Sequence, residues 1–145
     1  MINFFKEKLP TTKQKLIAVN NQVNKRIIYT TDFNQHEKRD IWQHPEMTLK
    51  SSKGDCEDIA SAKAYVLMRD YAFTKDDIKF LFVQHQYKED HLVLIIKDTY
   101  VLDNMVDEVM LVQDWVKHTK YKISLKFGYN DYMVRSMNDK KTKLA

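Results

Sequence analysis

Cys56, His91 and Asp103 are residue types that could together carry out nucleophilic chemistry. Cys56 is the single cysteine in 145 residues, so the chain can form neither an internal disulfide nor a zinc site built from several cysteines. His91 opens one apolar run and Asp103 closes the next. A thiol nucleophile needs a base to accept its proton, and the base needs an acid to orient it. These residues could supply all of these roles.

Cys56 lies at the predicted start of a helix. Gly54 breaks the preceding segment, Asp55 can cap the helix, and Glu57 and Asp58 suit the positive end of the helix dipole. Because this end favours an anion, we expect a thiolate that iodoacetamide alkylates well below the ~8.5 pKa of a free thiol. Alternatively, Cys56 is a small buried residue at the head of the apolar stripe of this helix. That stripe contains Ala60, Ala64 and Leu67.

A predicted β-hairpin brings His91 and Asp103 together. Its strands cover residues 91–97 and 100–103, and its turn lies around residues 97–99. With the hairpin centred there, the cross-strand partner of His91 falls within a residue or two of Asp103. We therefore expect the imidazole and the carboxylate at the same end of the sheet. The alternative is a structural hydrogen bond at the hairpin end, with no part in catalysis.

The rest of the chain predicts the elements that position these residues. Apolar residues at spacings of three and four indicate a helix over about 12–29. Further expected elements are strands over 78–84 and 121–127, a short helix around Trp115 within 106–118, and a loop or short turn over 45–53. Helices followed by a run of strands are typical of the α+β class with an antiparallel sheet. The length predicts one domain over 1–145, with a catalytic core over about 40–130 and a frayed tail over about 137–145.

The composition argues against several other classes of protein. It is ordinary for a folded domain, with 43% hydrophobic and 30% charged residues. The net charge is +4, but basic and acidic residues alternate without forming a stripe, so we expect no nucleic-acid binding. No apolar run approaches the ~20 residues that a membrane-spanning helix needs. Charged residues also interrupt residues 1–10, which predicts no secretion signal and a cytoplasmic location for the chain as written.

Short blocks of sequence surround the candidate residues in a recognisable order. They are Val19-Asn20, Val23-Asn24, Ile28-Tyr29 with Asp32, Asp40-Ile41-Trp42, Pro45-Glu46, Gly54-Asp55-Cys56-Glu57-Asp58 with Ala60 and Lys63, His91-Leu92-Val93-Leu94, and Val101-Leu102-Asp103-Asn104. This order resembles the bacterial transglutaminase-like cysteine proteinases, a family that includes the LapG-type adhesin proteases. Ile59 and Leu92 depart from it, since such proteins commonly have Tyr and Met there.

The resemblance implies a fold and an activity. It implies a papain-like or transglutaminase-like core in which the helix of the nucleophile packs against the antiparallel sheet. Cys56, His91 and Asp103 would form a catalytic triad that hydrolyses a peptide or amide bond through a thioacyl-enzyme intermediate. The substrate would be a protein or peptide, and the location would be the periplasm. Two alternatives stay open, a non-catalytic peptide-binding domain on the same fold and an amide acyltransferase.

The resemblance also implies a calcium ion held by carboxylates beside the nucleophile, although the chemistry itself requires no cofactor. The ligands would be Asp55 and Glu57, with Asp58 as a third. Three carboxylates around a thiol should raise its pKa, and a cation with oxygen ligands would offset that effect. The alternative is that these acids only cap the helix. Trp42 and Asn104 are candidates for lining the cleft, although a large aromatic residue such as Trp42 is more often part of a core.

Overall fold

A five-stranded antiparallel sheet forms the centre of the fold. The computed structural model describes residues 9–30 and 43–134. The strands are β3 (Ile78–Gln84), β4 (His91–Ile96), β5 (Tyr100–Leu102), β6 (Met110–Leu111) and β7 (Lys122–Gly128). Their order in the sheet is β6-β5-β4-β3-β7. The predicted α+β class with an antiparallel sheet is confirmed.

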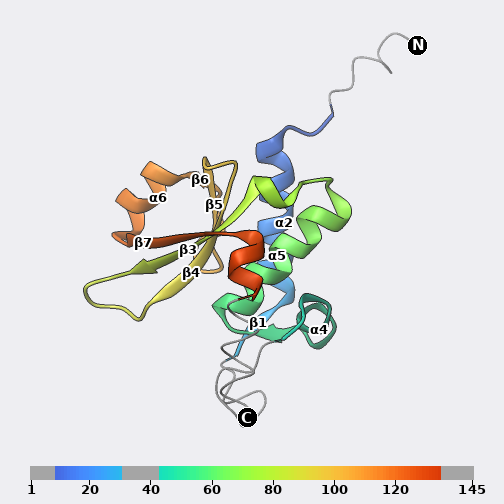
Figure 1. Ribbon diagram of the computed structural model, residues 1–145, viewed down its shortest axis with the longest axis horizontal. Coiled ribbons are helices and arrows are strands. Elements are labelled where there is room, and N and C mark those ends of the chain that lie inside the picture. The colour runs from blue at the N-terminus through green and yellow to red at the C-terminus, as the bar shows by residue number, and fades with distance from the viewer. Residues whose placement is uncertain (1–8, 31–42, 135–145) are drawn as a thin grey trace.

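Helices cover both faces of this sheet (Figure 1). Helices α2 (Thr12–Arg26) and α5 (Cys56–Asp70) pack together against one face, and their buried apolar residues form the larger core. Helix α6 (Val112–Thr119) contributes Trp115 to a smaller apolar cluster on the other face. Within the part of the chain that the structure describes, no helix has the length and apolar character needed to cross a membrane. The nucleophile helix therefore packs against the sheet, as expected.

Helix α2 ends earlier than the sequence predicts. Its apolar face is buried as expected, and a capping box between Thr11 and Gln14 fixes its start. Ile27 is extended, with φ −101° and ψ 121°, and leads into β1 (Ile28–Tyr29). The predicted extension of the helix to residue 29 is therefore wrong. The apolar spacing continues through Ile27, but the backbone has already left the helix there.

The expected loop over 45–53 is also wrong. Residues Pro45–Ser51 form helix α4, capped by His44, whose Nδ1 accepts a hydrogen bond from the N–H of Glu46 at 3.1 Å. Proline is tolerated at the first helical position, so Pro45 starts this helix where it would break the interior of another. The short 3₁₀ helix η1 (Lys75–Asp77) and the helical residues 129–134 were likewise not predicted. The expected frayed tail over 137–145 lies outside the described residues.

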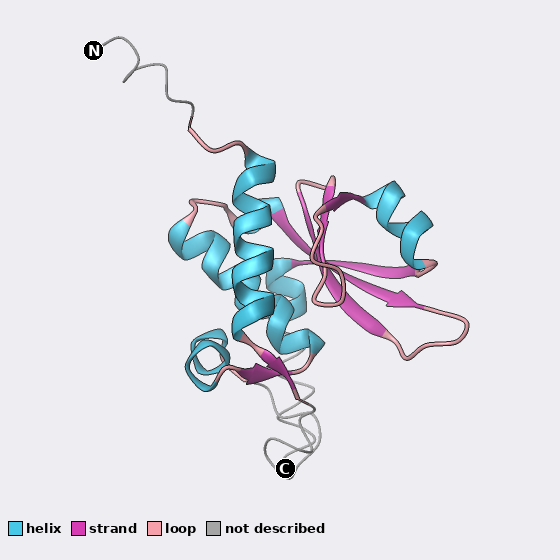
Figure 2. Cartoon of the chain, turned by 180° about the vertical axis from the view of Figure 1, so that it is seen from behind, coloured by secondary structure: helices cyan, strands magenta, loops and turns pink. Residues whose placement is uncertain are grey.

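A separate pair of short strands links the end of α2 to the start of α5. Strand β1 runs parallel to β2 (Lys53–Gly54), with Ile28 paired to Lys53 and Tyr29 to Gly54. Figure 2 shows this pair apart from the main sheet, near one end of α2 and α5. The pairing places Tyr29 close to Cys56, because Gly54 is only two residues before the cysteine.

The hairpin of β4 and β5 has the predicted turn. Lys97 and Asp98 have φ values of 54° and 52°, and the N–H of Thr99 donates to the carbonyl of Ile96 at 3.0 Å. Positive φ at both central residues is typical of type I′ hairpin turns. The pairing of Leu94 with Leu102 sets Asp103, the next residue, on the face of the sheet that also carries His91.

Candidate active site

The start of α5 is fixed by a reciprocal pair of hydrogen bonds. The N–H of Asp58 donates to Oδ1 of Asp55 at 2.9 Å, and the N–H of Asp55 donates to Oδ2 of Asp58 at 3.1 Å. Gly54 precedes this capping box, and a Cβ atom there would lie 2.6 Å from Cβ of Asp58. Any larger residue would therefore disturb the helix start. Cys56 occupies the first position of the helix, as predicted.

The surroundings of Cys56 favour the neutral thiol. Burial is the largest influence and, together with the charge of Asp55, raises the pKa of the thiol to about 12. Glu57 and Asp58 act in the same direction, while a hydrogen bond from the backbone N–H of Leu92 acts against them. The raising effect of the acids was expected. The pKa of the thiol is therefore shifted upward, opposite to the shift that we predicted from the helix start, because of burial and the three carboxylates.

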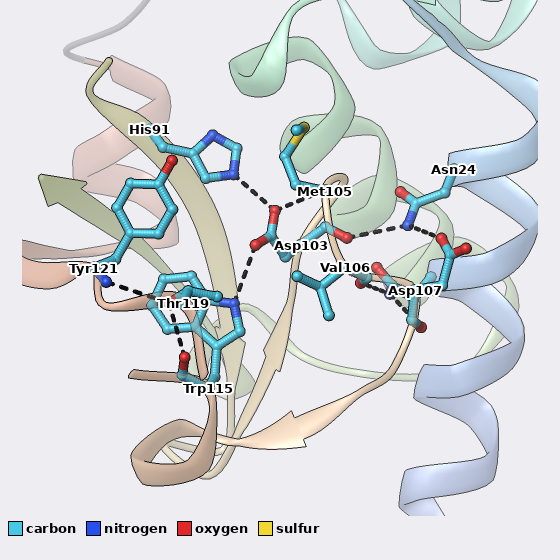
Figure 3. A network of polar contacts seen from close by, with 10 residues as sticks. Asn24, His91, Asp103, Met105, Val106, Asp107, Trp115, Thr119 and Tyr121 are labelled. Carbon is cyan, nitrogen blue, oxygen red and sulfur yellow. Dashed lines mark hydrogen bonds and ion pairs between the residues drawn. The ribbon is translucent and has the colours of Figure 1, made fainter. Parts of the chain in front are cut away.

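His91 and Asp103 form a buried hydrogen-bonded pair. Nε2 of His91 lies 2.7 Å from Oδ1 of Asp103, and the two side chains are 7% and 1% exposed. Oδ1 also accepts the backbone N–H of Met105 at 2.9 Å, and Oδ2 accepts the indole N–H of Trp115 at 3.1 Å (Figure 3). Each carboxylate oxygen of Asp103 therefore has at least one donor.

These hydrogen bonds keep Asp103 ionised. Burial, the largest influence, would raise the pKa of its carboxyl group, but the opposing effects together leave the pKa below its usual value. They are the hydrogen bond and charge of His91 and the hydrogen bonds from Met105 and Trp115. A carboxylate only accepts hydrogen bonds, so Nε2 of His91 carries the proton in this pair. Nδ1 is then the ring nitrogen that can accept a proton.

Helix α2 holds the loop that follows β5. Nδ2 of Asn20 donates to the carbonyls of Val106 and Asp107 at 3.2 and 3.0 Å. Nδ2 of Asn24 donates to the carbonyl of Asp103 at 3.0 Å and to Oδ1 of Asp107 at 3.2 Å. Side chains near the N-terminus of the chain thus anchor the backbone of the acid that orients His91 (Figure 3).

Cys56 and His91 line the same cleft, whose volume is about 670 Å³. Its other lining residues are Tyr29, Tyr87, Lys88, Glu89, Asp90, Asn104, Met105 and Tyr121. Asn104 is among these lining residues, and Trp42 lies outside the described residues. The cleft therefore brings the thiol and the imidazole to one surface.

Comparison with known proteins identifies the family of this chain. The model of the bacterial transglutaminase-like cysteine proteinase family (BTLCP) matches residues 5–134. The chain belongs to this family. No curated protein matches the sequence.

Solved structures of LapG from Legionella pneumophila have the same fold as this chain. The calcium-bound form is 22% identical, with a TM-score of 0.68, over 82% of this chain and 66% of that chain. The EGTA-treated form is also 22% identical, with a TM-score of 0.67, over 82% of this chain and 64% of that chain. The chain therefore spans slightly less than two thirds of the length of these LapG chains.

The predicted calcium ligands, Asp55, Glu57 and Asp58, do not form a metal-binding cluster in the part of the chain that the structure describes. Among residues 9–30 and 43–134, no group of three His, Cys, Asp or Glu side chains is placed to hold a metal ion. Asp55 and Asp58 instead each use one carboxylate oxygen to cap α5. The described residues thus have the donor chemistry for calcium without a preformed cage.

Several residues of the site were missed by sequence reasoning. Trp115 was predicted only as part of a short helix, and its contact with Asp103 depends on packing across the sheet. Tyr29 and Tyr121 carry no signal of a site in the sequence. They line the cleft because Tyr29 lies in β1 and Tyr121 lies just after α6. Lys63 did carry a signal, since a lysine seven residues after Cys56 falls on the apolar stripe of the helix.

Lys63 is buried near Asp103. Its side chain is 1% exposed, and burial lowers the pKa of its ammonium group to about 7. The charges of Asp103 and Asp107 oppose this shift, so both carboxylates lie near enough to interact with it electrostatically. The acid of the candidate triad therefore has a second basic neighbour inside the core, in addition to His91.

Proposed function

We propose that this proteinase hydrolyses peptide bonds with Cys56 as nucleophile, His91 as base and Asp103 as the acid that orients His91. The observation that carries this proposal is the 2.7 Å hydrogen bond between His91 and Asp103 in a cleft that also contains Cys56. Nucleophile, base and orienting acid are the groups that thiol-based acyl transfer requires. Membership of a cysteine proteinase family supports the same reaction class.

In the first half of the proposed reaction, the sulfur of Cys56 attacks the peptide carbonyl carbon while Nδ1 of His91 takes the thiol proton. The imidazolium then protonates the leaving nitrogen as the C–N bond breaks, which leaves a thioester on Cys56. In the second half, His91 takes a proton from water, and the resulting hydroxide adds to the thioester. Collapse of this adduct releases the carboxylic acid and returns the proton to the sulfur.

The first position of α5 supports the developing negative charge on the substrate oxygen. The backbone N–H of Cys56 has no acceptor within its own helix, because the first N–H groups of any helix lack one. Such a donor beside the nucleophile is suited to stabilise an oxyanion. Because burial and the neighbouring acids raise the pKa of the thiol, its proton moves to His91 during attack in this proposal.

Proteome-derived peptides incubated with the protein test this proposal. We expect the wild type to cleave peptides that Cys56→Ala spares, with new carboxyl termini identified by mass spectrometry. Methylamine in the same reaction separates hydrolysis from transfer, since an acyltransferase would produce methylamides in its presence. Cleavage that persists in Cys56→Ala would contradict the proposed nucleophile.

A peptide vinyl sulfone separates this proposal from a non-catalytic peptide-binding domain. We expect a covalent adduct on Cys56 in the wild type and strongly reduced labelling in His91→Ala, because the base is missing. Equal labelling of the two proteins would favour a binding domain with an ordinary thiol.

We also propose that calcium binds beside the nucleophile through Asp55 and Glu57, with Asp58. This rests on the LapG structure solved with calcium and on the carboxylates around Cys56. Calorimetric titration with Ca²⁺ should show binding that weakens in Glu57→Gln, a change that leaves the capping box of α5 intact. An absence of binding heat, or equal affinity in the variant, would leave these acids as helix caps alone.

A further inference from the structure

The indole N–H of Trp115 donates a hydrogen bond to Asp103, the acid of the proposed triad. The side chain of Trp115 is 0% exposed, and its indole N–H donates to Oδ2 of Asp103 at 3.1 Å. The other oxygen of that carboxylate faces His91 at 2.7 Å and accepts the N–H of Met105 at 2.9 Å. A carboxylate held at both oxygens cannot rotate freely, so Oδ1 stays directed at His91 (Figure 3).

Trp115 also reaches the base through an aromatic neighbour. The rings of Trp115 and Tyr121 are stacked, with centroids 5.7 Å apart and planes at 7°. Tyr121 in turn lies 5.5 Å from the ring of His91. Oγ1 of Thr119 joins the two aromatic residues at the end of α6, because it donates to the carbonyl of Trp115 at 2.8 Å and accepts the N–H of Tyr121 at 3.3 Å. The segment from Trp115 to Tyr121 therefore contacts both the acid and the base.

We propose that Trp115 is a positioning residue, which holds Asp103 so that His91 keeps its proton on Nε2 and presents Nδ1 to Cys56. This inference rests on the proposed triad. A tryptophan that served packing alone would need no particular partner for its N–H among the residues of the site. Trp115 is fully buried, its N–H contacts Asp103, and its stacked neighbour Tyr121 lies beside His91. Both of its specific contacts therefore lead to the His91–Asp103 pair.

Replacement of Trp115 by Phe tests the role of the indole N–H, since it keeps an aromatic ring and removes the donor. We expect the ring-nitrogen NMR shifts of His91 to report one Nε2-protonated tautomer in the wild type and a mixture in Trp115→Phe. Labelling of Cys56 by iodoacetamide at a fixed pH should slow about tenfold or more in the variant, because a misplaced base accepts the proton less readily. Cys56→Ala provides the blank.

Val116→Ala is the matched control. Val116 packs partly buried in the same apolar cluster as Trp115, so this change loosens α6 without removing the hydrogen bond to Asp103. We expect it to preserve the tautomer of His91 and the labelling rate. A similar change in both variants would attribute the effect to α6 packing and overturn the positioning role.

If Trp115→Phe does not fold, an isosteric replacement tests the role of the indole N–H. Benzothienylalanine at position 115 keeps the shape of the indole and replaces its N–H by sulfur. A single Nε2-protonated tautomer together with the wild-type labelling rate in this protein would overturn the proposal. Because the ring-nitrogen shifts need no substrate, they decide the role of Trp115 even where the wild type cleaves no peptide and the proposed function fails.

Discussion

Opposing influences act on the ionisation of the Cys56 thiol. Its position at the start of α5 favours the thiolate, but burial and the neighbouring acids raise the pKa of the thiol to about 12. The neutral form therefore dominates at neutral pH, and reactivity depends on the base. Sequence reasoning anticipated the effect of the carboxylates, which adjoin Cys56 in the chain. It could not anticipate the burial, which depends on how the sheet packs against the helix.

The charge of Glu57 should have a measurable effect on this thiol. In the presence of EDTA, we expect iodoacetamide alkylation of Cys56 to shift to lower pH in Glu57→Gln. Removing a nearby negative charge favours the thiolate and so lowers the pKa. Asp114→Asn, which changes an exposed acid on α6, should leave the profile unchanged. Identical profiles for Glu57→Gln and the wild type would refute this electrostatic account.

Lys63 should make stability depend on pH. Its pKa is lower in the folded state than in the unfolded chain, so its charged form destabilises the fold. This cost is complete below pH 7 and is relieved as the pH rises from about 7 towards the unfolded pKa of ~10.4. Lys63→Met should therefore be more stable than the wild type at pH 6.

The advantage of Lys63→Met should shrink by roughly 2–3 kcal/mol between pH 6 and pH 9, because only the wild type gains from deprotonation of Lys63. Urea unfolding at both pH values measures the difference. Lys25→Met, which alters an exposed lysine on α2, serves as the control and should follow the wild type. Parallel pH curves for Lys63→Met and the wild type would rule out this burial cost.

The elements around the site were predicted where local signals determine them. The helix start at Cys56 follows from adjacent capping residues, and the hairpin of β4 and β5 follows from two apolar strands separated by a short turn. Helix α4 was missed because its seven residues are too few to show a clear helical period. Strand β1 was hidden because its pairing with β2 joins segments far apart in the chain.

Gly54 shows how strictly the start of α5 is determined. We expect Gly54→Ala to lower the free energy of unfolding by about 1–3 kcal/mol, since its Cβ would clash with Cβ of Asp58. The variant should also lose peptide cleavage, because the clash lies beside Cys56. Gly128→Ala is a close control, since a Cβ at Gly128 meets nothing within 4 Å. Equal stabilities from urea unfolding would argue against the clash.

Across the whole molecule, the site depends on contacts between distant parts of the chain. Asn24 on α2 contacts Asp103 and Asp107, which lie 79 and 83 residues further along. Sequence reasoning found the catalytic candidates from residue type and local spacing, but it had no access to these amide contacts. They depend on the packing of α2 beside the end of β5.

Asn24→Ala should loosen the loop that carries Asp103. We expect faster hydrogen exchange at the amide of Met105, whose N–H donates to Asp103, because two hydrogen bonds that anchor this loop are lost. Exchange of backbone amides in β3 should change much less. Gln22→Ala alters an exposed residue on the same helix and should have no such effect. Unchanged exchange at Met105 in Asn24→Ala would show that the anchor is dispensable.

The hydrogen bond from Trp115 to Asp103 also has a consequence for synthesis of the protein. Chains emerge from the ribosome N-terminus first, so Cys56, His91 and Asp103 become available before α6 does. Until α6 has emerged and docked, Oδ2 of Asp103 lacks its indole donor and the ring of Tyr121 is not in place beside His91. The proposed peptide cleavage is therefore expected only after residues up to Tyr121 have emerged and α6 has docked.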